Sequence, residues 1–143
     1  MVPELLRRNC FEKVKVVEKQ MVPDGEFPTV VSPNPEDIGA FNMAVSQASD
    51  EDELILANDP DADRLGVMIR DSDKKWHWLT GNQIGVLILD FILSNLSKQN
   101  LLPNNGVIFT TVVTSPLVSK IAEEYGLKVV EVLTGFKWIR QAA

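Results

Sequence analysis

The chain has 143 residues, of which 45% are apolar and 24% are charged, and its formal net charge is −6. This balance is typical of a soluble globular protein and excludes an intrinsically disordered chain. The negative charge disfavours nucleic acid and anionic membranes, and we expect neither as a partner.

The single cysteine, Cys10, excludes an internal disulfide, and no basic-then-apolar signal segment opens the chain. We therefore expect a cytoplasmic protein. Cys10 is expected to be a small buried residue on a helix. The longest apolar run, residues 84–96, is shorter than the roughly 20 residues of a membrane-spanning helix and predicts a buried core helix.

The first half of the chain predicts helices separated by strands. A short helix over residues 2–9 precedes a strand over 13–18, where charged residues alternate with valines. After a proline-rich connection, a second helix is predicted from Pro35 to about residue 48, with Asn34 as its cap. Residues 54–57 are a continuous apolar run, typical of a strand that is buried on both faces.

A hairpin follows, with strands over residues 65–69 and 76–79. His77 lies between two tryptophans on the second strand and is expected on the opposite face from them. The remaining pattern predicts, in chain order, a helix over 83–96, a strand over 107–113, a helix over 116–125, a strand over 127–133 and a helix from 136 onward. Thr114 and Ser115 are expected to cap the helix over 116–125, although a helix N-terminus also attracts phosphate.

This alternation of strands and helices predicts an α/β fold, in which helices cover mixed, mostly parallel sheets. A break between Leu79 and Asn82 divides the chain into residues 1–79 and residues 80–143. The first half opens with a helix and the second ends just after a helix begins, so neither is a complete domain. We predict two partial three-layer αβα domains.

The most informative residues follow the apolar strand. Asp59, Asp61 and Asp63 are each separated by one residue, so their side chains can converge in a loop. Clustered carboxylates repel one another unless a cation neutralises them, and oxygen ligands suit Mg²⁺ or Ca²⁺ rather than zinc or copper. Arg64 follows at once, and its guanidinium suits a phosphate that also touches the metal.

Other interpretations of this loop differ in what they require of it. A calcium EF-hand is excluded, because its sixth and twelfth positions need Gly and Glu where this chain has Arg64 and Arg70. A haloacid-dehalogenase-type phosphatase is an alternative, with Asp59 as nucleophile and Asp61 as general acid. A non-catalytic module that binds a metal or a sugar phosphate is another. A solvated acidic turn is the simplest, because Asp-Pro-Asp is ordinary turn sequence.

Residues 58–66, NDPDADRLG, resemble the metal loop of the α-D-phosphohexomutases, a superfamily of sugar-phosphate mutases. The proline-rich residues 32–36 resemble the segment that this family places before its metal loop. Residues 80–85, TGNQIG, resemble the start of the family's third domain, and residues 133–139, LTGFKWI, its sugar-recognition turn. These motifs look most like the branch of phosphoglucomutase-2, phosphopentomutase and glucose-1,6-bisphosphate synthase.

The resemblance implies a phosphoryl relay. A phosphoserine of the enzyme gives its phosphoryl group to a sugar monophosphate, and the bisphosphate intermediate turns around before the other phosphate returns to the serine. The aspartates are implied to hold Mg²⁺, and Arg64 to contact the phosphoryl group. The residues implied to contact the sugar phosphate are Thr134, Gly135, Phe136 and Lys137.

The chain also departs from the family pattern. The family has four domains, and the serine loop of the first, the Glu-x-Ser-Gly loop of the third and the phosphate clamp of the fourth have no counterpart here. The resemblance therefore implies the later part of domain two in residues 1–79 and the earlier part of domain three in residues 80–143. We expect a parent phosphoglucomutase or phosphopentomutase, with a chain that is inactive without its missing domains.

Overall fold

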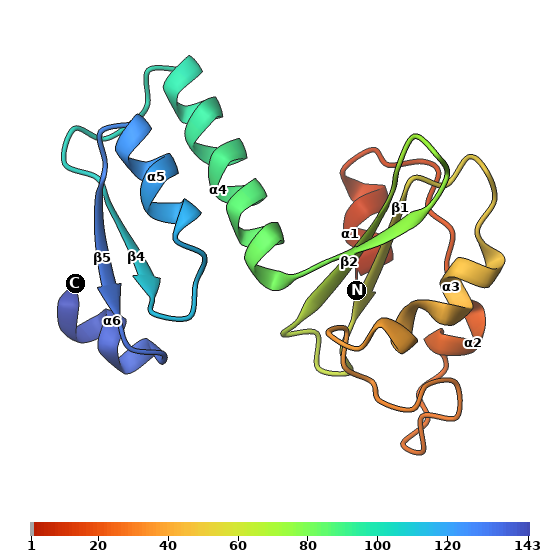
Figure 1. Cartoon of the computed structure of the whole chain (residues 1–143). Helices are drawn as coiled ribbons and strands as arrows, with labels where there is room; N and C mark the ends of the chain where they lie inside the picture. The colour runs from red at the N-terminus through yellow and green to blue at the C-terminus, as the bar shows by residue number, and fades with distance from the viewer. Residues whose placement is uncertain (1) are drawn as a thin grey trace. The chain divides into compact units, whose positions relative to one another are not determined.

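The computed structural model describes residues 2–143 (Figure 1). They divide into two compact units, Met1–Leu79 and Thr80–Ala143. Each unit combines helices with a sheet, which confirms the predicted α/β class. No helix in this described part of the chain is long and apolar enough to cross a membrane.

The sheet of the first unit is an antiparallel meander of β1 (Leu54–Asn58), β2 (Leu65–Arg70) and β3 (Trp76–Leu79), in that order. The prediction of mostly parallel pairing is wrong for this unit. The connections between these strands are too short for a parallel crossover, which needs a dozen or more residues, so they can join only antiparallel neighbours.

The core of this unit lies against one face of the sheet. It is formed by Phe41, Ile55 and Met68, which are buried, with smaller and half-buried residues packed around them. Leu54 alternates with Ile55 along β1 and is 53% exposed. The prediction that β1 is covered on both faces is therefore wrong, because successive side chains of a strand point to opposite faces and only one face of β1 is packed here.

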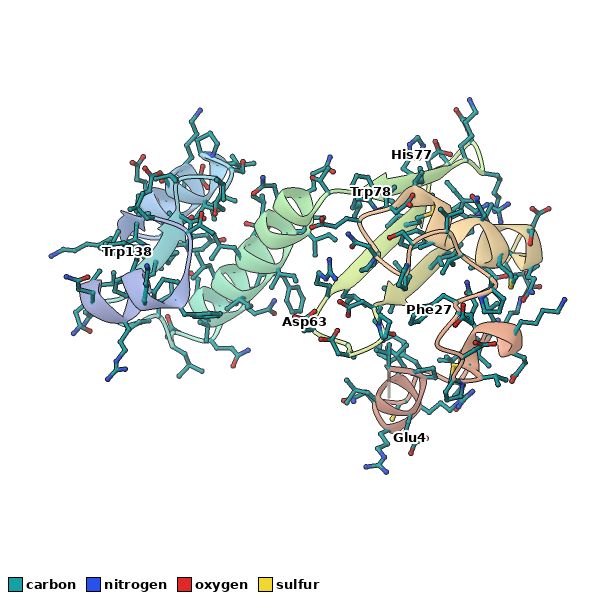
Figure 2. The ribbon with its side chains drawn as sticks, turned by 90° about the horizontal axis from the view of Figure 1, so that it is seen from below. Glu4, Phe27, Asp63, His77, Trp78 and Trp138 are labelled. Carbon is teal, nitrogen blue, oxygen red and sulfur yellow. The ribbon has the colours of Figure 1, made fainter. Side chains whose placement is uncertain are left out.

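Strand β3 follows the predicted alternation. Trp76 and Trp78 pack against the core, whereas His77 is exposed and bonds to Asp71 at 2.5 Å (Figure 2). The hydrogen bond from His77 lowers the pKa of Asp71. The histidine is thus engaged at the hairpin turn, on the face opposite the core.

The proline-rich connection ends in a 3₁₀ turn, η1 (Ile38–Phe41), followed by α3 (Asn42–Gln47). The predicted start at Pro35 is wrong. Asn34 forms a turn instead, its side chain accepting a hydrogen bond from the Glu36 amide at 3.0 Å, and Asp37 is the cap. The Pro35 carbonyl accepts a bond from Trp78 Nε1 at 3.3 Å, which holds Pro35 against the sheet and outside the helix.

The N-terminal segment begins with the predicted helix, α1 (Val2–Arg8). Cys10 lies beyond that helix at φ 66° and is exposed, so its predicted burial on a helix is wrong. The predicted strand over residues 13–18 is also wrong: this segment pairs with none of the described strands, and its end is in α2 (Glu18–Met21). Lys15 anchors it instead, donating to the Ser49 hydroxyl and the Asp52 carboxylate, each at 2.9 Å.

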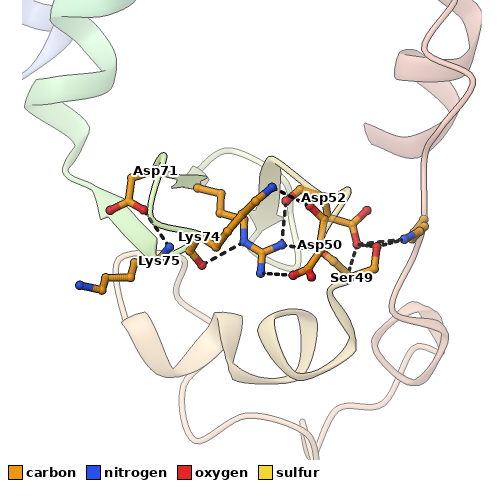
Figure 3. Close-up of polar contacts among 8 residues, drawn as sticks. Ser49, Asp50, Asp52, Asp71, Lys74 and Lys75 are labelled. Carbon is orange, nitrogen blue, oxygen red and sulfur yellow. Dashed lines mark hydrogen bonds and ion pairs between the residues drawn. The ribbon is translucent and has the colours of Figure 1, made fainter.

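A charged network closes the turn before β1 (Figure 3). Arg70, at the end of β2, donates to the Ser49 carbonyl at 2.5 Å and pairs with the Asp50 carboxylate at 3.2 Å, and its guanidinium lies over the Trp76 ring. Hydrogen bonds from Lys15 and then from Ser49 lower the pKa of Asp52 to about 2. Ion pairs thus order this end of the β1–β2 pair, while the aspartate loop closes the other end.

The second unit contains α4 (Gly81–Lys98), β4 (Val107–Thr111), α5 (Leu117–Glu124), β5 (Lys128–Val132) and α6 (Phe136–Ala142). These elements confirm the predicted order, with ends shifted by a few residues. Strands β4 and β5 are parallel, with α5 as the crossover between them. The predicted parallel pairing therefore holds in this unit.

Helix α4 begins with a capping box, in which the Gln83 amide donates to Thr80 Oγ1 and the Thr80 amide donates to Gln83 Oε1. The prediction of a buried core helix is wrong, because Leu93 is its one buried residue within the described chain and Phe91 is 68% exposed. A two-stranded sheet is too narrow to cover a helix that is apolar over most of its surface.

Candidate metal centre

The aspartate loop, residues 59–64, leaves the carboxyl end of β1 and returns as β2. The Ala62 amide donates to the Asp59 carbonyl at 3.0 Å, which closes a tight turn. Ala62 has a φ of 59°, in the left-handed region, where an L-residue costs roughly 1–2 kcal/mol. Pro60 restricts the backbone just before it. The left-handed backbone at Ala62 and the Ala62–Asp59 hydrogen bond therefore turn the loop back on itself.

This bend brings the three predicted metal ligands together. Asp59, Asp61 and Asp63 each offer a carboxylate oxygen, and these oxygens lie within 4.8 Å of one another. Around octahedral Mg²⁺, neighbouring ligand oxygens are about 3 Å apart and opposite ones about 4 Å apart. The oxygen donors therefore suit a hard divalent cation, and they would draw together from separations of at most 4.8 Å to bind one. Asp59 is 1% exposed, while the other two carboxylates face solvent, as Figure 2 shows for Asp63.

Arg64 is the charged partner of the buried carboxylate. Its backbone amide donates to Asp59 Oδ1 at 3.0 Å and its Nε donates to Asp59 Oδ2 at 2.7 Å. The same Nε lies 3.6 Å from Asp63 Oδ1. One guanidinium thus faces two of the three predicted ligands.

The electrostatics of the loop are uneven. Burial opposes ionisation of Asp59, but the hydrogen bonds from Arg64 outweigh it and lower the pKa of this carboxyl to about 2. The pKa of Asp63 is raised, first by its hydrogen bond with Asp59 and then by the negative charges of Asp61 and Asp59. Arg64 alone therefore leaves Asp63 in a repulsive environment, which a divalent cation would relieve.

The proline-rich segment is docked beneath this loop through Gly66. A Cβ at Gly66 would lie 2.5 Å from the Pro35 carbonyl oxygen and 2.8 Å from the Phe41 ring. Together with the Trp78–Pro35 hydrogen bond, this contact places residues 32–36 beside the metal loop. Sequence reasoning missed the roles of Gly66 and Trp78. The signal was available, because a glycine inside a strand often marks the close approach of another backbone.

The four predicted sugar-phosphate contacts lie in the second unit, in the turn that follows β5 and the start of α6. Gly135 has a φ of 124°, which only glycine adopts without strain. Thr134, Phe136 and Lys137 are exposed, and the Lys137 ammonium lies 4.9 Å from the Trp138 ring centroid. The structure thus brings the metal-loop residues together in one unit and these four together in the other.

The loop after β4 lies at the same edge as this turn, because the carboxyl ends of parallel strands meet at one edge of a sheet. The N-cap of α5 is Pro116, without a side-chain cap, so the predicted capping by Thr114 or Ser115 is wrong. Ser115 Oγ accepts a hydrogen bond from the Leu117 backbone amide at 3.3 Å just before the helix, and Thr114 bonds to Thr111. Asn82, missed by sequence reasoning, accepts from the Ser115 amide at 3.0 Å and donates to the Val113 carbonyl. The first turn of α4 therefore holds this loop in place.

Known proteins resemble the chain along nearly its whole length. A family model described as phosphoglucomutase/phosphomannomutase, alpha/beta/alpha domain II, matches residues 1–73, and the model for alpha/beta/alpha domain III of the same family matches residues 80–143. A phosphoglucomutase of Staphylococcus haemolyticus is 36% identical over 143 residues, which are 99% of this chain and 25% of that protein. A probable phosphomannomutase of Haemophilus influenzae is 43% identical over 125 residues, or 87% of this chain and 25% of its own length.

A solved structure of a phosphoglucomutase/phosphomannomutase family protein from Burkholderia thailandensis has a TM-score of 0.60 and covers 83% of this chain and 24% of that one. At 24% identity, this similarity shows the fold alone. The chain spans about a quarter of the length of the curated relatives that it matches. Its two halves nevertheless match two successive domains of one family, with the aspartate loop in the first match. The chain therefore belongs to the phosphoglucomutase/phosphomannomutase family of the α-D-phosphohexomutase superfamily.

Proposed function

We propose that this chain forms the Mg²⁺-binding and sugar-phosphate-binding centre of a mutase. The whole enzyme would interconvert a sugar 1-phosphate with a sugar 6- or 5-phosphate, through a phosphoserine and a bisphosphate intermediate. The observation that carries the proposal is the convergence of Asp59, Asp61 and Asp63 within 4.8 Å, beside Arg64. It occurs in a chain whose two halves match domains II and III of the mutase family.

In this proposal the three aspartates hold Mg²⁺ through their carboxylate oxygens. The bound ion would supply Lewis-acid neutralisation of the charge on the transferring phosphoryl group. Arg64 is half-exposed, and none of its hydrogen bonds within residues 2–143 uses a terminal guanidinium nitrogen. Those nitrogens are open to phosphate oxygens, which a guanidinium holds in a fork.

The turn after β5 has the chemistry for binding a sugar phosphate. Thr134 offers a hydroxyl, Gly135 and Phe136 offer exposed backbone, and Lys137 offers a positive charge. We assign these four residues to the sugar phosphate. The motifs ANDPDADR and TGFKW look most like the branch of phosphoglucomutase-2, phosphopentomutase and glucose-1,6-bisphosphate synthase, and we propose a parent enzyme of that branch.

The chain contains no assigned catalytic residue of its own. The phosphoserine would come from another part of a longer protein, in agreement with relatives about four times its length. The chain by itself is then a binding module without turnover, with sugar phosphates and the remaining domains as partners. We propose a cytoplasmic parent enzyme, because the one cysteine of this chain is exposed and has no disulfide partner within the chain.

The phosphatase alternative requires Asp59 as the nucleophile. In the structure Asp59 is 1% exposed, and both of its oxygens accept hydrogen bonds from Arg64. A buried and doubly bonded carboxylate is a poor nucleophile, because attack needs a free oxygen within reach of the phosphorus. The geometry therefore disfavours a nucleophilic role for Asp59. We therefore expect that no aspartyl-phosphate can be trapped on Asp59.

Calorimetric titration of the full chain with MgCl₂ tests the proposal. We expect saturable binding that is clearly weaker in Asp61→Ala, because the hard cation loses one of three carboxylate ligands. Asp73→Ala is the control, since Asp73 is an exposed acid in the hairpin turn and its loss changes the net charge equally. Absent binding by the wild-type chain, or equal binding by Asp61→Ala, would overturn the metal assignment.

A further inference from the structure

The buried carboxylate of the metal loop already has a cation. Asp59 is 1% exposed, and an unpaired charge at such a position would be costly. Arg64 compensates it with a 2.7 Å bond from Nε to Oδ2. The protein thus stabilises the loop with its own guanidinium.

The position of that guanidinium matters more than the bond itself. Its Nε lies 2.7 Å from Asp59 Oδ2 and 3.6 Å from Asp63 Oδ1, so it stands between two of the three proposed Mg²⁺ ligands. A divalent ion bound by both carboxylates would have to share this space with a positive charge. Two cations so close together repel each other strongly where solvent screening is reduced.

We infer that Arg64 is a built-in competitor of the metal: its guanidinium holds the loop in shape without an ion and must withdraw from Asp59 and Asp63 when Mg²⁺ binds. This inference rests on the proposed function. Its consequence is that Arg64 lowers the affinity of the loop for Mg²⁺ and, once displaced, is free to contact a phosphorylated ligand. Metal binding and release of the guanidinium are then one coupled step.

Variants of Arg64 can test this competition, because the backbone hydrogen bonds that close the aspartate loop do not depend on the Arg64 side chain. The Ala62 amide still donates to the Asp59 carbonyl, and the backbone amide of residue 64 still donates to Asp59 Oδ1. Arg64→Gln deletes the charge and keeps a side chain of similar length. Arg64→Lys keeps the charge. Lys75→Gln deletes an exposed charge at the hairpin turn, at the far end of β2 from the loop.

Calorimetric titration of these full-length chains with MgCl₂ measures the competition. We expect Arg64→Gln to bind Mg²⁺ about tenfold more tightly than the wild-type chain, because a neighbouring positive charge has been removed. Arg64→Lys keeps the charge but not the planar guanidinium, so its Mg²⁺ affinity should lie between those of wild type and Arg64→Gln. Lys75→Gln should stay within about twofold of wild type. Without metal, Arg64→Gln should melt at a lower temperature than wild type, and saturating Mg²⁺ should raise its melting temperature by more than it raises that of wild type.

The outcomes separate this inference from the proposed function. If the wild-type chain binds Mg²⁺ and Arg64→Gln binds it equally or more weakly, the competition is overturned. The proposed metal site is then retained. Absent binding in every chain would overturn both.

The wild-type chain provides an independent measurement, which does not depend on how well a variant folds. The Nε–H proton of Arg64 is hydrogen-bonded to Asp59 without metal. Its signal in a ¹⁵N-correlated spectrum should shift, and its exchange with water should accelerate, as Mg²⁺ saturates the site. A signal that stays unchanged through saturation would show that the guanidinium does not move, and would overturn the inference.

Discussion

The aspartate loop, residues 59–64, and the turn at residues 134–137 both leave the carboxyl end of a strand, but they are built differently. The metal loop follows β1 and encloses a buried carboxylate, and the core residue Phe41 lies beneath it against Gly66. The turn at residues 134–137 follows β5 and is exposed throughout. The loop proposed to bind a metal is shaped by packing and ion pairs, whereas the turn proposed to bind a sugar phosphate is an exposed surface that offers donors to solvent.

The largest expected difference in stability is between replacing a phenylalanine in the core and replacing one on the surface. Phe41→Ala should lower the free energy of unfolding of the first unit by about 3 to 5 kcal/mol, because Phe41 is 1% exposed at the centre of the core. Phe136 is 88% exposed, and Phe136→Ala should change stability by less than about 0.5 kcal/mol. Urea denaturation of the two variants measures both values, and equal losses would break the comparison.

A methyl group tests the docking of the proline-rich segment. Gly66→Ala would place a Cβ 2.5 Å from a backbone oxygen, and we expect a loss of about 2 to 3 kcal/mol together with weaker Mg²⁺ binding. Gly85→Ala is the matched change in α4, where a Cβ would meet nothing within 4 Å. It should stabilise the second unit by about 0.5 to 1 kcal/mol, through helix propensity. Urea titrations and calorimetry check both, and a neutral Gly66→Ala would contradict this account of the loop.

Acid should weaken the charged network at the other end of β1. The folded-state pKa of Asp52 is about 2, below the value of about 3.9 in an unfolded chain, so its contribution is fully present above pH 5 and is lost as the pH falls toward 2. Asp52→Ala should cost about 1 to 2 kcal/mol at pH 7, and the gap to wild type should close across this window. Glu51→Ala, an exposed acid in the same turn, is the control and should differ little from wild type at any pH.

The smallest expected effects have opposite signs in the two regions. Ala62→Gly removes the strain of a left-handed alanine but adds disorder to the unfolded chain, so we expect a gain below about 1 kcal/mol. Gly135→Ala forces an alanine to a φ of 124° and should cost about 1 kcal/mol or more. Thermal denaturation measures both changes, and a gain from Gly135→Ala would show that the turn relaxes to another backbone shape.

Local pattern predicted most elements but not their surroundings. The hairpin at β2–β3 and the order of elements in the second unit follow from short-range signals, and the structure confirms them. The strand expected at residues 13–18 and the burial expected for Cys10 are wrong. Pairing and burial depend on which distant residues are close enough to cover a segment, and alternation or apolarity alone does not contain that information.

The sequence by itself determined the chemistry of the candidate site. Three aspartates with single-residue spacing, a following arginine and an apolar strand before them were sufficient to predict a hard-metal loop, because charge and ligand type are properties of the residues. Only the tertiary structure decided that Asp59 is buried, that the guanidinium of Arg64 stands between two of the carboxylates, and that Gly66 admits the Pro35 backbone. These are distances between groups whose side chains converge only when the strands pair and the core packs against them.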